Sequence, residues 1–250
     1  MLLHILVMNS SLLQRLLLTL AALFALGMPR PSAASTIFWG STFEQDVLFD
    51  AAGQPLGGEF SFEIGSFEGG FVPTMENLND WAANWKVFDR AYDPTPLDAD
   101  DGDPEGWNST EQFFVGTVGH TLTGGSDSPD ADPTDTFPQG EVIYLWVYNT
   151  KNREAGTEWA LVTDGTNLGD NFSDWVFPDP TDVGSYDLML EDADLAIVGG
   201  LNGTSGGGQP YTIQTAVIPV PEASSMLLMG VAALTGLMLR RRKCLRADAH

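Results

Sequence analysis

Residues 142–148 read Val-Ile-Tyr-Leu-Trp-Val-Tyr, an uninterrupted run of β-branched, aliphatic and aromatic side chains. Such side chains fit the pleated surface of a sheet, and a strand that is apolar on both faces is buried on both sides. We therefore predict that this stretch is a central strand. By contrast, residues 59–64 (Glu-Phe-Ser-Phe-Glu-Ile) alternate polar and apolar side chains, which predicts a strand with one face in water.

Working outward, further segments share this enrichment and are separated by Gly, Pro, Asp and Asn. They are residues 36–39, 112–118, 159–163, 186–190, 195–198 and 211–218. The Gly- and Ser-rich residues 202–208 predict a flexible linker to the last of them. About eight short strands at this spacing predict an all-β fold, an antiparallel β-sandwich of the jelly-roll-like kind.

One short helix is expected within this β fold. Asn79 or Asp80 can cap its N-terminus with a side-chain oxygen. Trp81, Trp85 and Phe88 then recur at the i, i+4 and i+7 spacing of an apolar helix face.

The charge of the chain is strongly unbalanced. Its 250 residues carry 34 acidic against 11 basic side chains, a net charge of -23. Between residues 35 and 221 only 4 basic residues face 32 acidic ones, so this segment alone carries -28. A binder of nucleic acid needs a basic face to meet phosphates, so this class is excluded. With 14 Phe and 7 Trp, the chain has enough large apolar side chains for a core.

The N-terminus has the pattern of a secretory signal. Arg15 precedes the uncharged run 16–27, and Ser-Ala-Ala follows at residues 32–34. A basic entry, a short apolar stretch and small residues at the -3 and -1 positions are typical of a signal peptide. We predict a signal peptide over residues 1–34 with cleavage after Ala34.

The C-terminus has a second apolar segment. Val220, Pro221 and Glu222 lead into residues 223–239, which are 17 residues without a charge. This length is at the lower limit for a transmembrane helix. A basic cluster follows at once, and such clusters stay on the cytoplasmic side, so the preceding domain is predicted to lie outside. The cluster consists of Arg240, Arg241, Arg242 and Lys243.

With these residues the tail resembles the PEP-CTERM sorting signal of Gram-negative bacteria. Val220, Pro221 and Glu222 match the family pattern Val-Pro-Glu-Pro, whereas Ala223 replaces the second proline. The resemblance implies recognition and processing near this motif by an integral-membrane exosortase. It also implies anchoring in the inner membrane before processing, and then association with the cell envelope or the extracellular matrix. The chain is thus divided into a signal peptide (1–34), an acidic ectodomain (35–218) and a sorting signal (219–243).

Few residues point to catalysis. His120 is the only histidine between the terminal segments, and the only cysteine of the chain is Cys244. Triads that depend on His or Cys, and zinc sites with several His or Cys ligands, are therefore excluded from the ectodomain. No phosphate-binding or dinucleotide-binding glycine motif is present, so no cofactor and no catalytic residue is predicted. A glycosidase needs only two carboxylates, and among 32 acidic residues such a pair has no specificity.

Two acidic stretches, residues 93–108 and 124–140, are predicted to be long loops. In the first, Asp101, Asp103 and Glu105 partly follow the spacing of a calcium-binding loop, but position 12 is Gln rather than Glu. A solvated acidic loop is the simpler interpretation, and a Ca²⁺ site is left open. The second loop has a looser set of carboxylates at Asp127, Asp130, Asp132 and Asp135.

The tryptophans leave two alternatives open, since they can either stack on sugar rings or fill the space between two sheets. The residues concerned are Trp85, Trp107, Trp146, Trp159 and Trp175. The sequence as a whole leaves three functional hypotheses. The favoured one is a non-catalytic cell-surface or matrix protein associated with exopolysaccharide. The others are a carbohydrate-binding module, with or without structural Ca²⁺, and a polysaccharide hydrolase or lyase.

Overall fold

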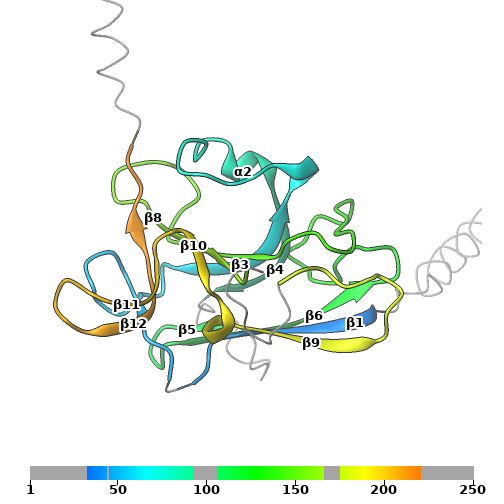
Figure 1. The fold of residues 1–250 in the computed structure, drawn as a ribbon, viewed down its shortest axis with the longest axis horizontal. Coiled ribbons are helices and arrows are strands. Elements are labelled where there is room, and N and C mark those ends of the chain that lie inside the picture. Colours follow the sequence, from blue (N-terminus) through cyan, green and yellow to red (C-terminus); the bar gives the residue numbers. More distant parts are fainter. Residues whose placement is uncertain (1–32, 44, 93–105, 166–174, 221–250) are drawn as a thin grey trace, which may run out of the picture.

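The computed structural model describes residues 33–220 except 44, 93–105 and 166–174, and the described part is mostly β-sheet (Figure 1). A four-stranded sheet has the order β5 (Gly106–Asn108), β6 (Phe113–Thr121), β1 (Ala33–Gly40) and β9 (Gly184–Met189). A second sheet has the order β10 (Leu195–Val198), β8 (Glu158–Thr163), β7 (Tyr144–Tyr148), β3 (Ser61–Phe67) and β4 (Trp85–Tyr92), and β13 (Ala216–Val217) also pairs with β8. A small third sheet joins β11 (Gly200–Thr204), β12 (Pro210–Gln214) and β2 (Leu48–Phe49). The helical elements are α2 (Trp81–Asn84) and the 3-10 turns η1 (Glu68–Gly70) and η2 (Leu190–Asp192).

The strand pairing departs from the prediction in one respect. Most neighbours are antiparallel, as expected, but β1 runs parallel to β9 and β2 runs parallel to β12. One edge of β1 is already occupied by antiparallel β6, and β9 takes the other edge. The fold is therefore all-β with mixed sheets rather than purely antiparallel ones.

The predicted central strand is confirmed. β7 lies in the middle of its sheet between β3 and β8. Its side chains alternate between two separate cores: Leu145 and Val147 point into one, and Trp146 and Tyr148 into the other. Because both faces of the strand are covered, both sets of side chains have to be apolar or aromatic, which explains the unbroken run in the sequence.

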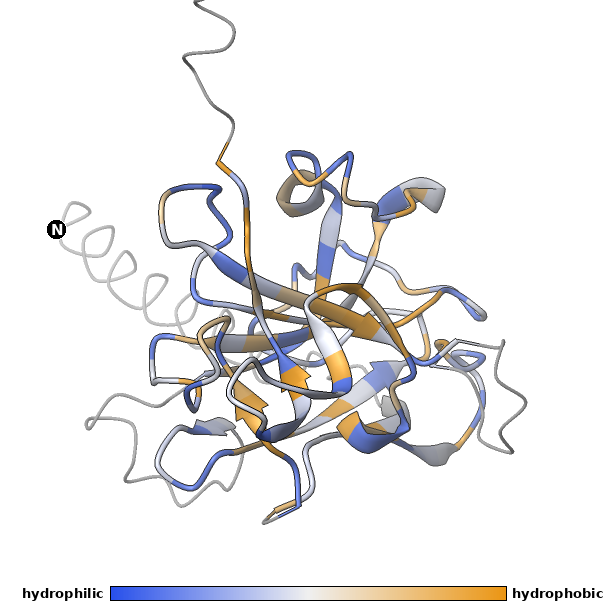
Figure 2. Cartoon of the chain, turned by 60° about the vertical axis from the view of Figure 1, so that its left-hand side comes forward, coloured by the Kyte–Doolittle hydropathy of each residue, from blue (hydrophilic) through white to orange (hydrophobic). Residues whose placement is uncertain are grey.

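The larger core, here called the inner core, lies between the two main sheets. Phe62 of β3 stacks on Phe114 of β6 with ring centroids 4.2 Å apart, and it also meets Trp107 of β5 at 4.8 Å. Trp39 of β1 donates from its indole nitrogen to Asp89 of β4 at 2.7 Å. These contacts join the sheets into two layers, and Figure 2 shows the hydrophobic residues in the strands with hydrophilic loops around them.

The second core, here called the outer core, lies on the opposite face of the β7 sheet. It is covered by the segment that contains α2, which brings Leu78 and Trp81 onto Trp146 and Trp159. Trp81 stacks on Trp159 with centroids 5.6 Å apart and meets Trp146 edge-on at 6.0 Å. Edge-on and offset contacts of this kind are the favourable ones for aromatic rings.

The predicted helix is wrong over most of its length. α2 covers only Trp81–Asn84, and Asp80 at its N-cap makes no side-chain cap bond. From Trp85 the chain is strand β4, paired along β3. Trp85 and Phe88 are three residues apart along the strand, so alternation places Trp85 in the outer core and Phe88 in the inner core. The spacing that resembles a helix therefore belongs to a strand with a core on each face.

The predicted linker over residues 202–208 is also wrong in part. Gly200–Thr204 form strand β11, which pairs antiparallel with β12. Asn202 has a positive φ of 46° and Gly208 one of 79°. These conformations suit Asn and Gly, so the composition reflects a twisted hairpin rather than a flexible connection.

Candidate functional site

The described chain ends in a segment that is tightly attached to the domain. Ala216 and Val217 of β13 pair with Trp159 and Glu158 of β8. Ile218 follows with 1% of its surface exposed, and its N–H donates to the carbonyl of Thr157 at 2.8 Å. The last core residue therefore lies directly before the predicted sorting signal.

Arg153 holds the next residue. Its Nη2 donates to the carbonyl oxygen of Pro219, and its Nη1 donates to Oδ1 of Asn79 at 2.5 Å. One guanidinium thus connects the segment before α2 with the first residue of the predicted signal. Its planar fork of donors suits such a two-point contact.

The turn between β7 and β8 positions Arg153. The hydroxyl of Thr157 donates to the carbonyl of Asn152 at 2.6 Å and accepts the N–H of Glu154 at 3.0 Å. Asn149 donates to the carbonyl of Gly156, a residue with φ of 86°. These side-chain bonds to the backbone are what Asn and Thr supply in turns.

The structure reaches the predicted sorting residues only in part. Val220 is described and 44% exposed. Pro221, Glu222, the span 223–239 and the basic cluster at 240–243 lie outside the described residues. In the described part of the chain no helix is long and apolar enough to cross a bilayer.

The predicted cleavage site lies at the start of the fold. Ala34 belongs to β1, the strand that pairs with both β6 and β9, and Ala33 is paired with Thr121. Ser35, the residue after the predicted cut, is 2% exposed. The bond after Ala34 thus lies within a paired strand, so a peptidase would reach it only while β1 is undocked.

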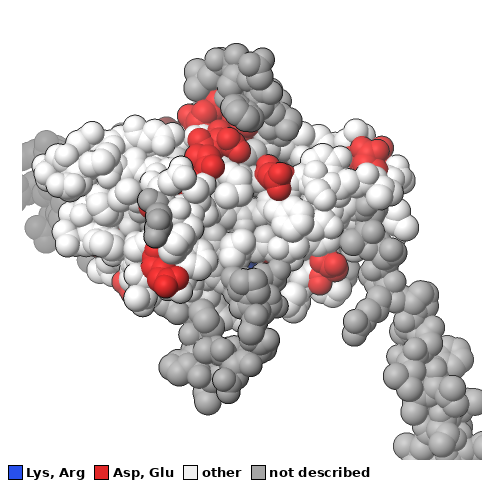
Figure 3. All heavy atoms as spheres, turned by 90° about the horizontal axis from the view of Figure 1, so that it is seen from below, with Lys and Arg blue, Asp and Glu red and all other residues white. Residues whose placement is uncertain are grey.

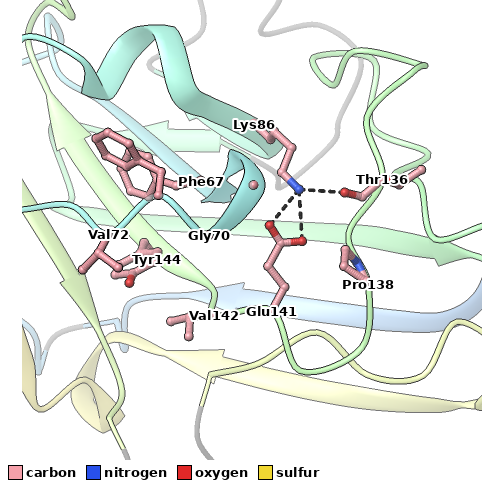
Figure 4. A pocket seen from close by; sticks show the side chains of 11 residues that line it. Phe67, Gly70, Val72, Lys86, Thr136, Pro138, Glu141, Val142 and Tyr144 are labelled. Carbon is pink, nitrogen blue, oxygen red and sulfur yellow. Dashed lines mark hydrogen bonds and ion pairs between the residues drawn. The ribbon is translucent and has the colours of Figure 1, made fainter.

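A pocket of about 550 Å³ opens between the segment after β3 and the segment before β7 (Figure 4). Aromatic rings form part of its wall: Phe67 stacks on Phe71 with centroids 5.3 Å apart, and Tyr144 meets Phe67 edge-on at 5.5 Å. Burial raises the pKa of the Tyr144 hydroxyl, so this group stays protonated and available as a donor. This part of the pocket offers an apolar face and one polar atom.

The polar side of the pocket is an ion pair. Nζ of Lys86 lies 2.7 Å from Oε1 and 3.0 Å from Oε2 of Glu141, and it donates to the carbonyl of Thr136 at 2.7 Å. These contacts use the donors of the ammonium, so it does not attract a further anion. Burial, followed by the charges of neighbouring acids, raises the pKa of nearby Asp135. The pocket therefore suits a neutral polar ligand.

The structure contains a buried carboxylate that was not predicted from the sequence. Glu63 of β3 was predicted to lie on a wet face, but none of its surface is exposed. Oε1 accepts the Tyr148 hydroxyl and Nε of Arg90, both at 2.6 Å. Oε2 accepts the Trp85 indole at 2.7 Å and lies 2.5 Å from Nζ of Lys151. Polar alternation along a strand shows which face a residue takes but not what covers that face.

The pKa shifts around Glu63 follow from burial and charge. For Arg90, burial lowers the pKa, but the charges of Glu63, Tyr148 and Asp130 and the hydrogen bond to Glu63 together outweigh it, and the pKa is raised. For Lys151, burial prevails over the attraction of Glu63 and lowers the pKa. Burial and the carboxylate together raise the pKa of Tyr148. Glu63 thus meets two cations and two neutral donors inside the domain.

The few basic residues of the domain do little to offset its acidic surface. Each of the four basic residues of the ectodomain makes an internal contact: Lys86, Arg90, Lys151 and Arg153. On the face shown in Figure 3, acidic side chains are exposed at several places and almost no Lys or Arg is visible. A surface of this kind stays hydrated and repels anionic partners.

The other predicted residues take structural roles. His120 is fully buried, its Nε2 lies 3.1 Å from the carbonyl oxygen of Phe137, and burial lowers its pKa. The predicted loop 124–140 contains no helix or strand, and three of its four candidate carboxylates are directed to different partners. Asp127 accepts from the N–H of Gly119, Asp130 pairs with Arg90, and Asp132 accepts from Thr134.

No metal centre forms in the described part of the chain, where no group of three or more His, Cys, Asp or Glu side chains is arranged to hold an ion. The first candidate calcium ligands, Asp101, Asp103 and Glu105, lie outside the described residues. Gln112, at position 12 of that stretch, instead donates to the carbonyls of Leu56 and Ser109.

The two alternatives for the tryptophans are resolved in favour of the core. Each of the five is at most 9% exposed: Trp85, Trp107, Trp146, Trp159 and Trp175. The alternative in which these rings form an exposed sugar-stacking face is wrong, because the two sheets and the α2 segment cover them.

Comparison with known proteins gives one result. Residues 219–243 match the family model of the PEP-CTERM protein-sorting motif. No curated protein and no solved structure matches the chain. The chain therefore carries a PEP-CTERM sorting signal, which implies export and membrane-anchored processing by an exosortase-type enzyme, and this signal begins one residue after buried Ile218.

Proposed function

We propose that this chain is a non-catalytic cell-surface or matrix protein that is sorted by an exosortase and associates with exopolysaccharide. The observation that carries the proposal is the sorting motif at residues 219–243, which continues directly from the folded acidic domain. The domain supplies a compact, hydrated body, and the tail supplies its attachment to the envelope.

Two features support a non-catalytic role. The single histidine of the domain is buried in a ring cluster. The buried carboxylate Glu63 has hydrogen-bond donors on both oxygens, so it has no free position for a substrate. If the purified protein released reducing ends from matrix polysaccharide, this part of the proposal would be wrong.

The test of sorting compares two hosts, one with an exosortase and one in which the exosortase gene is deleted. The full chain carries a tag in an exposed domain loop. We expect a shortened form in the envelope or matrix fraction of the first host and a longer, membrane-bound form in the second. Identical full-length protein in the cytosol of both hosts would contradict the proposal.

The pocket favours a second candidate function, the binding of a neutral carbohydrate. A pyranose ring has an apolar C–H face that packs on aromatic rings and hydroxyls that pair with acids and amines. Tyr144 and Phe71 supply the first kind of contact, and Glu141 the second. The charge of the domain and the saturated ammonium of Lys86 argue against an anionic glycan.

Titration with neutral polysaccharide fractions of the host tests this candidate through the intrinsic fluorescence of the domain. We expect binding to be lost in Tyr144→Ala and weakened in Glu141→Gln. Tyr92→Ala is the matched control, because Tyr92 is a 47% exposed tyrosine at the end of β4 and does not line the pocket. Equal binding by all three variants would place the sugar elsewhere.

A further inference from the structure

The junction between the domain and the sorting signal has no spacer. From buried Ile218 to Pro221 is a distance of three residues, which span ~10 Å even when fully extended. The side chains of Val217 and Pro219 are exposed, but the backbone of this segment up to Pro219 is hydrogen-bonded to the domain. Val220, which is 44% exposed, is the last residue that the structure describes. Whatever enzyme acts near Pro221 therefore works next to the folded surface.

Access of a protease depends on these bonds. Enzymes that cut a chain bind it in an extended form and pair with its main-chain groups. Here the N–H of Ile218 is used by Thr157, and the carbonyl of Pro219 is used by Arg153. A segment bonded in this way becomes a substrate only in proportion to the time it spends detached.

We propose that Arg153 is a positioning residue that holds the backbone through Pro219 against the domain, so that processing is restricted to the residues that follow Pro219. The inference rests on the proposed exosortase processing for its biological meaning, but the geometry itself does not depend on it. Arg153 is well suited to this role because it also holds Asn79, beside the segment that covers the outer core.

Holding the chain through Pro219 also affects the structure of the processed protein. A cut beyond Pro219 removes the signal without removing any bond of β13 or the buried side chain of Ile218. The signal can therefore be removed while the last strand of the domain stays intact.

The first experiment measures hydrogen exchange of the Ile218 amide in the full chain, purified in detergent from a host without an exosortase. In Arg153→Ala we expect exchange about threefold to tenfold faster than in the wild type, as befits the loss of a partly exposed charged hydrogen bond. Arg153→Lys keeps the positive charge but loses the planar guanidinium, so the exchange rate of the Ile218 amide should lie between those of the wild type and Arg153→Ala. Glu154→Gln changes the charge at the neighbouring residue and should leave the exchange unchanged.

Tryptophan fluorescence melting of each variant reports whether the domain is folded, since all seven Trp lie in the domain. If Arg153→Ala does not fold, Asn79→Ala is used instead, because it removes only the second anchor of the guanidinium and should also speed the exchange of Ile218. Wild-type exchange in the folded variants would overturn the inference.

The second experiment determines the C-terminus of the processed protein by mass spectrometry in a host with an exosortase. We expect one end at or beyond Val220 in the wild type and additional, shorter ends in Arg153→Ala. A single unchanged end in the variant would count against Arg153. Absence of any processing, combined with altered exchange of Ile218, would refute the proposed function and leave the positioning role intact.

Discussion

The two faces of the β7 sheet are built on different principles. The inner core is apolar and aromatic, and it joins residues from both main sheets. The outer core is dominated by Trp81, Trp146 and Trp159, and beside it lies the buried Glu63 with its cations. The inner face is thus held mainly by burial of apolar surface, whereas the outer face also depends on a satisfied polar network.

This difference shows how a very acidic domain uses its few basic residues. Arg90 and Lys151 both contact the buried Glu63, and Arg90 pairs with Asp130 as well. A charge taken out of water is tolerated only when partners replace the water. The outer face should therefore be sensitive to changes in hydrogen-bonding groups, and the inner face to changes in volume.

The largest effect is expected from Glu63→Ala. The change leaves Arg90, Lys151, Tyr148 and Trp85 without their common acceptor, so it should lower the free energy of unfolding by about 3–5 kcal/mol. Urea unfolding followed by tryptophan fluorescence measures this loss. In a double-mutant cycle with Arg90→Met the two losses should be far from additive. Additive losses would mean that the two residues do not act as one network.

The adjacent residue on the opposite face provides the matching test. Ile64 of β3 is 1% exposed in the inner core. Ile64→Ala should cost about 2–4 kcal/mol through lost burial and a cavity, and Ile64→Val about 1 kcal/mol. The same urea unfolding measures both variants. A loss that did not grow with the number of methyl groups removed would contradict a volume-limited inner core.

The smallest effect concerns pH. Burial lowers the pKa of His120 below its ordinary value of 6.5, so below pH 6.5 the unfolded chain binds a proton that the folded domain does not. The free energy of unfolding is therefore not reduced by His120 above pH 6.5. It decreases as the pH falls below this value, with a slope of at most about 1.4 kcal/mol per pH unit for one proton. His120→Gln should make the unfolding free energy between pH 7.5 and 5.5 less dependent on pH. An equal slope in both proteins would show that folding does not lower the pKa of His120.

Much of the sheet was predictable from local patterns. The run 142–148 and the segment 159–163 are apolar on both faces because each contributes to both cores. The strand over 59–64 was also found, but the wet face assigned to Glu63 was wrong. An alternating pattern of polar and apolar residues shows only that the two faces of a strand differ. It does not show that Trp85, Tyr148 and Lys151, from other parts of the chain, cover Glu63.

Other features depended on contacts that local patterns do not contain. Trp85 and Phe88 have helical spacing, yet β4 forms because β3 offers its backbone bonds to this segment. Arg153 has no motif around it, and its role arises because a turn brings it to Pro219, 66 residues further along the chain.

The amino-acid sequence by itself determined the β-rich class, the strongly negative charge and the sorting signal, because strand propensity, net charge and a contiguous motif are all encoded locally. Only the tertiary structure decided which carboxylate is buried, which rings are hidden and which cation holds the exit of the signal. These depend on long-range packing, in which partners far apart in sequence replace the water that each group would otherwise keep.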